Sequence, residues 1–560
     1  MKIKSILTNT LVFLSIYAAA QQYPGYTSYS TKNSTSSFLV DTNGINYHTW
    51  THSTGKPTCY STYVMPGGYL YRTVTKTGNS FTGGPISGEF EKYDYNGNLL
   101  WDFVYSTTTY CTHHDICPMP NGNVLMIAYE SKTAAEVAAA GCTTFSNTMW
   151  PDKIVEVQQT GATTGTIVWE WHIWDHLVQN TNPNGANYQT SIVNHPELLN
   201  INQGAQKDWL HVNGVDYNPI LDQIVISSHN MSEMYVIDHS TTTAEAASHT
   251  GGNSGKGGDI LYRWGNPQIY GAAGTQIFNV VHDAHWIDEG CPNSGDLSGY
   301  NNKGISATAS CADIFTPPVN GYNYNINLGS AFTPASYTKR QASGGYNSNE
   351  GSSQQLPNGN MLVNMGISGF IKEFDPNGTL LWSKTLTGGN AKAFRYSDCY
   401  INNAPPAIPA ITDNSGTLSS TNAASYQWYL NGQQIPGATA QNYTPSQSGI
   451  YLVRVTDANG CVYQYSAGYN FSLTTGISEN DKTTFEVYPN PSTGIININE
   501  TKKSGKHFEV MVYDVTGKLL VKNRTIYQLN LSEFGKGLYS VVILPENSKE
   551  IKNFKIVITE

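Results

Sequence analysis

The sequence is poor in charge, because only 13% of its 560 residues are Asp, Glu, Lys or Arg. Its formal net charge is -10, and it contains no long basic run. It therefore lacks the electrostatic footprint of a protein that holds a phosphate backbone, and nucleic acid is not an expected partner. Gly (52) and Tyr (37) are abundant instead, together with Asn and Thr. This mixture favours turns and strands over helices and predicts an all-β fold.

Cysteine is also scarce, with eight residues and no Cys-x-x-Cys pair, so a structural zinc site made of thiolates is unsupported. In an exported chain such residues form disulfides. The nearest candidate pairs are Cys111 with Cys117 and Cys291 with Cys311, although pairing cannot be read from sequence.

Long apolar runs are missing except near the start of the chain. Lys2 and Lys4 precede an apolar run from Leu11 to Ala20, and three alanines before Gln21 satisfy the small-residue cleavage rule. Residues 1–20 therefore predict a secretory signal peptide. The alternative, a membrane anchor, fits less well because the run is too short to cross a bilayer. No other stretch is long enough, so we expect no membrane span after signal removal.

A repeated unit with two halves is the most informative feature that is present. Its first half is a strand, a tight turn and a second strand, and it recurs at Tyr63–Tyr71, Ile116–Met126, Val215–Val225 and Gln354–Val363. Asn-Gly between apolar strands, as in two of these segments, is a strong hairpin signal. The second half is a hairpin ending in Trp, at Phe38–Trp50, Phe90–Trp101, Ile154–Trp169, Tyr235–Trp264 and Phe370–Trp382.

Two hairpins make a four-stranded blade, and such blades bury their faces only against neighbouring blades. We therefore expect a closed β-propeller of about six blades over residues 30–402. A chain of 560 residues exceeds the roughly 250–300 residues of a single core, so further domains must follow. A β-sandwich array or another solenoid is the alternative, but four strands per roughly 50 residues is typical of propellers.

The composition changes after Cys399, where Pro405, Pro406 and Pro409 make a stiff linker. Ser425–Gly432 and Gly449–Thr456 then have the pattern of strands in a small β-sandwich, predicted over residues 405–475. This segment resembles the Ig-like or PKD-like modules of bacterial surface proteins.

A second small sandwich is predicted over residues 485–560. Val487–Gly494, Gly537–Ser540 and the basic-apolar end Lys552–Ile558 resemble the C-terminal sorting domain of the type IX secretion system. The resemblance implies that the tail is an address read by the type IX secretion machinery. The protein would then be secreted, or held at the cell surface, by a Gram-negative bacterium.

Three histidines recur at one position of the repeat, His114, His211 and His282. Each lies eight residues before a turn, at Gly122, Pro219 and Gly290 respectively. Because an inner strand runs from one rim of its blade to the other, these side chains are expected at the same rim, beside the central channel. An imidazole titrates near pH 6.5 and can be a nucleophile, an acid or a metal ligand, whereas a structural hydrogen bond is the alternative role of each one.

Four segments carry a specific family resemblance: Asp208–Tyr217, Ile226–His229, Val236–Asp238 and the element around Val281–Ala284. They resemble the arylsulfotransferase family over most of residues 30–400. This resemblance implies a six-bladed propeller that needs neither PAPS nor another cofactor. Sulfate would move from a phenolic sulfate ester to an acceptor phenol through a sulfohistidine.

The resemblance also implies roles for single residues. His282 would be the nucleophile, in a Gln-His pattern that here reads Val-His, while His211 and His114 would donate to the sulfuryl or bridging oxygens. Better-known bacterial members carry Arg after Ser-Ser, but this chain has His229, a weaker and pH-dependent cation. Arg263 is the candidate for the permanent charge, with packing as its alternative role.

Two carboxylates adjoin these histidines, Asp115 and Asp283, and are candidates to fix their tautomers, although neighbours in a strand point to opposite faces. Two other functions stay open. The propeller could be non-catalytic and bind a ligand or glycan, or His114, His211 and His282 could hold a metal ion.

Overall fold

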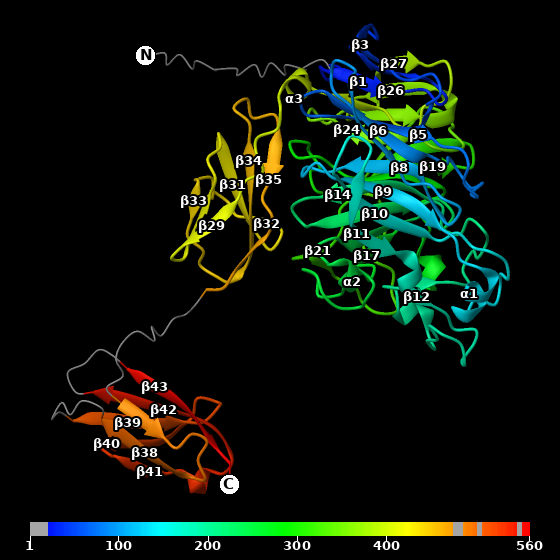
Figure 1. Ribbon diagram of the computed structural model, residues 1–560. Coiled ribbons are helices and arrows are strands. Elements are labelled where there is room, and N and C mark those ends of the chain that lie inside the picture. Colours follow the sequence, from blue (N-terminus) through cyan, green and yellow to red (C-terminus); the bar gives the residue numbers. More distant parts are fainter. Residues whose placement is uncertain (1–20, 474–484, 501–506, 546–550, 560) are drawn as a thin grey trace, which may run out of the picture. The chain divides into compact units, whose positions relative to one another are not determined.

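The computed structural model describes residues 21–473, 485–500, 507–545 and 551–559, so the predicted signal peptide lies outside the described residues. The described chain is built almost entirely of strands (Figure 1), which confirms the all-β prediction. It divides into two units, residues 1–473 and 474–560.

Six four-stranded antiparallel sheets occupy residues 26–396 of the first unit. In order from the innermost strand, the first three are β28 (Phe394–Tyr396), β1 (Tyr26–Tyr29), β2 (Ser36–Val40) and β3 (Asn46–Thr51); β4 (Thr58–Met65), β5 (Tyr69–Thr75), β6 (Gly88–Tyr93) and β7 (Leu99–Val104); β8 (Tyr110–Pro118), β9 (Val124–Glu130), β10 (Asp152–Gln159) and β11 (Gly165–His172).

The other three sheets follow in the same order from the innermost strand. They are β14 (Val212–Asn218), β15 (Gln223–Ser228), β16 (Glu233–Asp238) and β17 (Tyr262–Trp264); β18 (Val281–Trp286), β19 (Leu297–Ser306), β20 (Ala309–Phe315) and β23 (Lys339–Ala342); β24 (Ser352–Gln355), β25 (Met361–Met365), β26 (Phe370–Phe374) and β27 (Leu380–Thr385).

The inner ends of these sheets form a closed ring. β4 contacts β8, β8 contacts β14, β14 contacts β18, β18 contacts β24, and β24 contacts β28. The ring closes because β28, from the end of this region, pairs with β1, from its start, and β1 contacts β4. This arrangement confirms the predicted β-propeller, and each four-stranded sheet is one blade.

The faces of neighbouring blades pack through apolar side chains. Between the second and third blades, for example, buried Phe90 and Trp101 join a cluster with Met126 and Val155. Because every blade shares such a cluster with its neighbours, no blade can bury its faces alone.

Both halves of the sequence repeat are hairpins in the structure. The Tyr63–Tyr71 segment forms β4 and β5, and the Phe90–Trp101 segment forms β6 and β7. The repeat did not identify the outer strands of the fifth blade, because 23 residues separate β20 from β23 and include a separate strand pair, Val319–Asn320 with Asn323–Tyr324.

Short helices and strand pairs lie outside the six four-stranded sheets. They are α1 (Ala134–Ala139), α2 (Thr243–Ala246), α3 (Asp398–Asn402), η1 (Ile173–Asp175), η2 (Ile192–Asn194), η3 (Pro267–Tyr270), η4 (Gly366–Ser368) and the pairs β12 (Leu177–Val178) with β13 (Leu199–Asn200) and β21 (Val319–Asn320) with β22 (Asn323–Tyr324). Within the described residues, every helix is too short or too polar to cross a bilayer.

A two-sheet sandwich follows the propeller in the same unit. One sheet contains β29 (Ile411–Asn414), β30 (Thr417–Ser420) and β33 (Asn442–Tyr443); the other contains β32 (Gln433–Gln434), β31 (Ser425–Leu430), β34 (Gly449–Thr456), β35 (Tyr463–Tyr465) and β36 (Tyr469–Phe471). Buried Trp428 and Val453 lie in its core. The predicted sandwich is present, and its Ig-like kinship stays a prediction.

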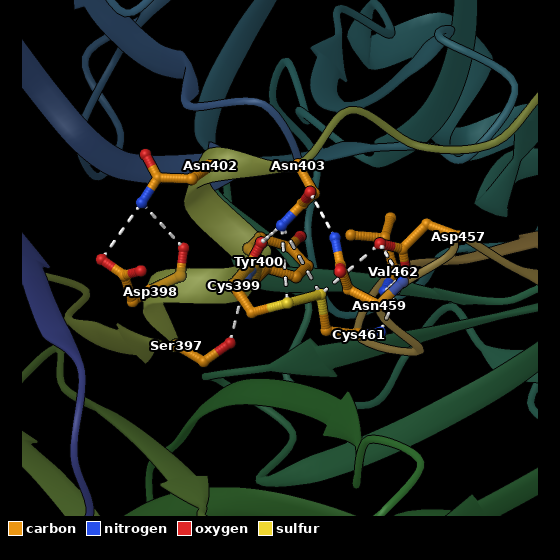
Figure 2. The surroundings of a disulfide bond; sticks show 10 residues. All are labelled: Ser397, Asp398, Cys399, Tyr400, Asn402, Asn403, Asp457, Asn459, Cys461 and Val462. Carbon is orange, nitrogen blue, oxygen red and sulfur yellow. Dashed lines mark hydrogen bonds between the residues drawn. A yellow bond between two sulfur atoms is a disulfide. The ribbon is translucent and has the colours of Figure 1, made fainter.

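A disulfide between Cys399 and Cys461 joins α3 to this sandwich (Figure 2). Around it, the Asn403 amide donates to the Cys399 carbonyl at 2.8 Å and the Asn459 amide donates to Asn403 Oδ1 at 2.7 Å. Glu289, in the turn after β18, also forms an ion pair with Arg454 of the sandwich.

The predicted disulfides are wrong, since Cys111, Cys117, Cys291 and Cys311 are all free and buried. Cys111 and Cys117 both lie in β8, and their pairing partners in β9, Tyr129 and Leu125, are four residues apart, which places the two cysteines roughly 13 Å apart along the strand. A disulfide requires Cα atoms within about 7 Å.

The second unit is another two-sheet sandwich. Its sheets are β37 (Phe485–Tyr488), β38 (Ile495–Glu500) and β41 (Gln528–Asn530), and β40 (Leu519–Arg524), β39 (Phe508–Tyr513), β42 (Gly537–Pro545) and β43 (Lys552–Ile558), with η5 at Ser532–Phe534. An apolar core runs between the sheets, which confirms the predicted sandwich.

Candidate active site

Irregular backbone in or next to three inner strands orients the candidate histidines. The pairing of β8 with β9 shifts register between Thr112 and Ile116, around His114. A similar shift follows His282 in β18, and another follows His211 at the start of β14. His114 and His211 also have positive φ angles, 50° and 54°. Bulges and left-handed residues of this kind re-aim side chains and cluster at functional sites.

The structure brings four of the predicted residues together. The ring centroids of His114 and His211 lie 4.6 Å apart, those of His211 and His229 5.0 Å, and those of His229 and His282 5.5 Å. We call these four residues the histidine arc. His114 and His282, at its two ends, are each only 1% exposed.

His282 is held in one tautomer by Asn302. The Nδ1 atom of His282 lies 2.7 Å from Asn302 Oδ1, while the Asn302 amide nitrogen donates to the carbonyls of Asn347 and Glu350. Asn302 Oδ1 is therefore the acceptor, and Nδ1 of His282 carries the proton. The Nε2 lone pair accepts from the Glu350 N–H at 3.2 Å. Burial, then the neighbouring His229, lowers the pKa of His282 well below its ordinary value, so the ring is neutral.

His211 is paired with a carboxylate. Its Nδ1 atom lies 2.6 Å from Asp208 Oδ2. Burial opposes ionisation of Asp208, but the bond to His211 outweighs it and lowers the pKa of this carboxyl below its ordinary value. Gly84 packs against the arc, because a Cβ there would lie 2.3 Å from Cε1 of His211 and 2.5 Å from Cε1 of His114. Only glycine therefore fits at position 84. Because Nδ1 of His211 faces Asp208, the Nε2 atom of this ring lies on the side away from the carboxylate.

His114 is oriented by a second histidine that the sequence analysis missed. The Nδ1 atoms of His114 and His113 lie 2.8 Å apart, and the His113 ring stacks on Tyr129 with centroids 3.6 Å apart. Nε2 of His113 lies 2.9 Å from Asp152 Oδ1. Burial, and after it His211, lowers the pKa of His114 well below its ordinary value. Burial, followed by the charge of His211, also lowers the pKa of His229.

Asp115 and Asp283 do not fix histidine tautomers, contrary to the prediction. Both point to Lys392, whose Nζ lies 2.5 Å from Asp115 Oδ2 and 2.8 Å from Asp283 Oδ1. The alternation of a strand explains this, because each Asp faces away from its adjacent His. Asn302 and Asp208 take the expected role instead.

Arg263 does not join the histidine arc. It lies in β17, the outermost strand of its blade, where Glu233 accepts from its guanidinium and the carbonyls of Pro196 and Leu198 accept from its Nη1. The guanidinium also lies over the Tyr270 ring, 4.3 Å from its centroid. Its role as the anion-binding cation is therefore wrong, and it is a packed structural ion pair.

A metal ion held by His114, His211 and His282 is not supported. In the described part of the chain, two groups of at least three side chains have ligand atoms within 4.8 Å of one another, and the histidine arc is neither of them. Residues of the inner strands and Lys392 line a separate cavity of about 210 Å³, whose lining includes Tyr63, Val215 and Asp283 but none of the four histidines of the arc.

Sequence comparison decides the family. The profile of the arylsulfotransferase (ASST) family matches residues 7–392, more than half of the chain. The chain belongs to the arylsulfotransferase family. A second profile, the secretion system C-terminal sorting domain, matches residues 486–559 of this arylsulfotransferase-family protein. The tail therefore indicates export to the cell surface or secretion.

No curated protein matches this family member. Among solved structures, it is similar to a protein of unknown function from Bacteroides caccae, with 10% identity and a TM-score of 0.38 over 66% of this chain and 98% of that chain. It is also similar to PorZ, a surface component of the type-IX secretion system of Porphyromonas gingivalis, with 12% identity and a TM-score of 0.24 over 94% of this chain and 64% of that chain. These similarities are too low to bear on function.

The buried neutral histidines make stability depend on pH. Burial lowers the pKa of His113, His114 and His282 well below 6.5, so below that pH the unfolded chain binds protons that the native chain does not. The free energy of unfolding is expected to fall as the pH drops from about 6.5 to 5, by up to about 1.4 kcal/mol per pH unit for each histidine. Urea titrations at several pH values measure this slope. His282→Gln should reduce the number of protons taken up on unfolding by about one and so make the slope shallower. An unchanged slope would contradict the neutral state of His282.

Proposed function

We propose that the protein transfers sulfate from a phenolic sulfate ester to a phenol without PAPS, through a sulfohistidine at His282. The observation that carries the proposal is the neutral His282 ring, whose Nδ1 proton is held by Asn302, whose Nε2 lone pair accepts from the Glu350 N–H, and which lies beside His229 in the arc. A neutral imidazole with a fixed tautomer is a competent nucleophile.

In the first step, Nε2 of His282 attacks the sulfur of the donor ester. An N–S bond forms, the bond between sulfur and the phenolic oxygen breaks, and its electron pair leaves with the phenolate. The Glu350 N–H, which occupies the lone pair in this structure, is displaced by the substrate. His211, protonated on Nε2 and stabilised by Asp208, gives its proton to the departing phenolate.

In the second step, the acceptor phenol gives its proton to Nε2 of His211 while its oxygen attacks the sulfur. The N–S bond breaks, and its electron pair returns to Nε2 of His282. His114 and His229, the other rings of the arc, offer N–H donors to the sulfuryl oxygens in both steps. His229 thereby serves where related proteins carry Arg.

Steady-state kinetics with 4-nitrophenyl sulfate as donor and phenol as acceptor test the proposal. We expect release of nitrophenolate that depends on phenol, with parallel double-reciprocal plots, because the donor product leaves before the acceptor reacts. If no aryl sulfate releases its phenol under any condition, the transferase proposal fails and a non-catalytic propeller that binds a ligand or glycan replaces it.

The Asp208–His211 pair offers a separate prediction. Asp208→Asn is expected to lower kcat by about 10²-fold, because an amide no longer stabilises the protonated imidazole or holds its tautomer. The pH profile of kcat should shift at the same time, which loss of packing alone would not cause. Asp222→Asn is the matched control, since Asp222 accepts in the same way from His239, at 2.7 Å, outside the arc. Equal losses in the two variants would contradict the assigned role.

A further inference from the structure

A second cluster of possible ligands lies where the segment after the third blade meets a loop of the fourth blade, separate from the histidine arc. It consists of His176, His249 and Asp259, whose ligand atoms all lie within 4.8 Å of one another. His176 follows η1, while His249 and Asp259 lie at the two ends of the glycine-rich loop between α2 and β17. Residues distant in the chain are thus brought to one point by the packing of this loop on η1.

One contact of His176 brings two acceptor atoms close together. Nε2 of His176 lies 2.8 Å from the Ala246 carbonyl, which can only accept, so Nε2 carries a proton. In the neutral ring, Nδ1 then has a lone pair, yet it lies 3.0 Å from Oδ1 of Asp259, which is also an acceptor. Two acceptors at this distance require a proton or a metal ion between them.

His249 turns this pair into a three-ligand group. Its Nδ1 atom lies 2.7 Å from the same Oδ1 atom of Asp259. A single carboxylate oxygen thus faces the Nδ1 atoms of two imidazoles. His239 makes a useful contrast, because it lies between Asp222 and Glu156; although burial opposes protonation, these two carboxylates raise its pKa to about 9. There, one protonated imidazole lies between two carboxylates. At Asp259, by contrast, two imidazoles face a single carboxylate oxygen.

The surroundings of His176 are those of a metal ligand. A ligating histidine usually donates its second N–H to a backbone carbonyl, as Nε2 does to Ala246. The Trp171 ring lies parallel to His176, with centroids 5.7 Å apart, and its Nε1 donates to the Gly258 carbonyl at 2.7 Å. A Cβ at Gly258 would lie 1.9 Å from the Ala246 oxygen and 2.6 Å from His176 Nε2, so the loop must carry glycine there.

We propose that His176, His249 and Asp259 bind a divalent late first-row metal ion, of which Zn²⁺ is the representative. Two imidazoles and a carboxylate suit such an ion, and water would complete a tetrahedral shell. His176 is fully buried, but the His249 side chain is 62% exposed, so the ion can enter from solvent. The ion would fasten the glycine-rich loop to η1. The other group, Glu89 with Glu91 and Asp102, is occupied by Lys56 and supports no such site.

Calorimetric titration of the full chain, made without a polyhistidine tag and freed of metal with a chelator, tests this site with Zn²⁺ at pH 7.5. We expect one equivalent to bind and the thermal midpoint to rise. His249→Ala, at an exposed position, and the isosteric Asp259→Asn should each weaken binding at least about 10-fold. Affinity should also fall as the pH is lowered, because protons compete with the metal ion for the imidazole nitrogens.

Two controls separate this site from other histidines. His195→Ala removes a surface histidine that pairs with Glu197, and His229→Ala removes a member of the histidine arc; both should keep the full equivalent of Zn²⁺. Co²⁺ should give visible bands of a tetrahedral complex in the wild type and not in His249→Ala. The proposal is overturned if the wild type binds no Zn²⁺, if His249→Ala binds it equally well, or if His229→Ala removes the binding.

Discussion

Replacing His282 with alanine is expected to lower the rate of sulfate transfer by at least about 10³-fold. The proposed reaction forms its covalent bond at Nε2 of this ring, and alanine offers no atom that can take the sulfuryl group. The other rings of the arc cannot substitute, because the position of His282 is fixed by Asn302 on one side and the Glu350 backbone on the other. Phenol-dependent release of nitrophenolate by equal amounts of both proteins measures the effect.

His282→Gln serves as a companion variant, because its amide can still hydrogen-bond to Asn302 and fill most of the space of the ring. It should be equally inactive while keeping the circular dichroism spectrum of the parent. His195→Ala, outside the arc, should keep full activity. If His282→Gln retained more than a tenth of the parent rate while folded, His282 would not be the nucleophile.

Replacing Lys392 with methionine is expected to reduce the free energy of unfolding by about 3–5 kcal/mol. Lys392 is 2% exposed, and its ammonium group lies between Asp115, Asp283 and the Tyr63 hydroxyl. Burial disfavours its charge, but the two carboxylates outweigh burial and raise the pKa of Lys392 above its ordinary value. Removing the ammonium leaves Asp115 without its cation and leaves Asp283 with only His285, whose Nδ1 lies 3.4 Å from Asp283 Oδ2. Urea unfolding at pH 7 measures the loss.

Lys384→Met is the matched control, because this half-exposed lysine donates only to the Gly44 carbonyl. Its effect should stay within about 0.5 kcal/mol. A triple variant that also carries Asp115→Asn and Asp283→Asn should recover part of the stability, since it removes both buried carboxylate charges. A loss below about 1 kcal/mol in Lys392→Met would contradict the importance of this ion cluster.

The Lys392 cluster also supports the strands that carry the histidine arc. Asp115 follows His114 in β8, and Asp283 follows His282 in β18, so one ammonium ties together two strands that carry opposite ends of the histidine arc. We expect Lys392→Met to impair sulfate transfer through the positions of these strands, even at temperatures where the variant is folded.

The propeller could be predicted from the sequence because each hairpin is specified by a short stretch of neighbouring residues. An Asn-Gly turn such as that after Pro120, flanked by apolar strands, specifies a hairpin without reference to the rest of the chain. The equal offset of His114, His211 and His282 from the turns at Gly122, Pro219 and Gly290 then predicted that the rings lie at one rim, since strand length fixes where a residue lies along a blade. The outer strands of the fifth blade were found only in the structure, because a long connection separates the last two of them.

The hydrogen-bond partners of the histidines could not be predicted from the local sequence. Asp208 lies three residues before His211, but Asn302 is 20 residues from His282 and is brought there by β19 pairing with β18. Arg263 was misassigned because a buried arginine and a ligand-binding one look alike in sequence. Its carboxylate partner, Glu233, becomes visible only when β16 and β17 pair.

The most direct test of the account is the mass of the peptide that contains His282 after the protein is incubated with 4-nitrophenyl sulfate in the absence of a phenol acceptor. This peptide is expected to gain the mass of one sulfuryl group at His282, under alkaline conditions that preserve the N–S bond, and to lose it when phenol is added. An active protein whose peptides all keep their unmodified masses, or one that carries the group on another residue, would contradict it.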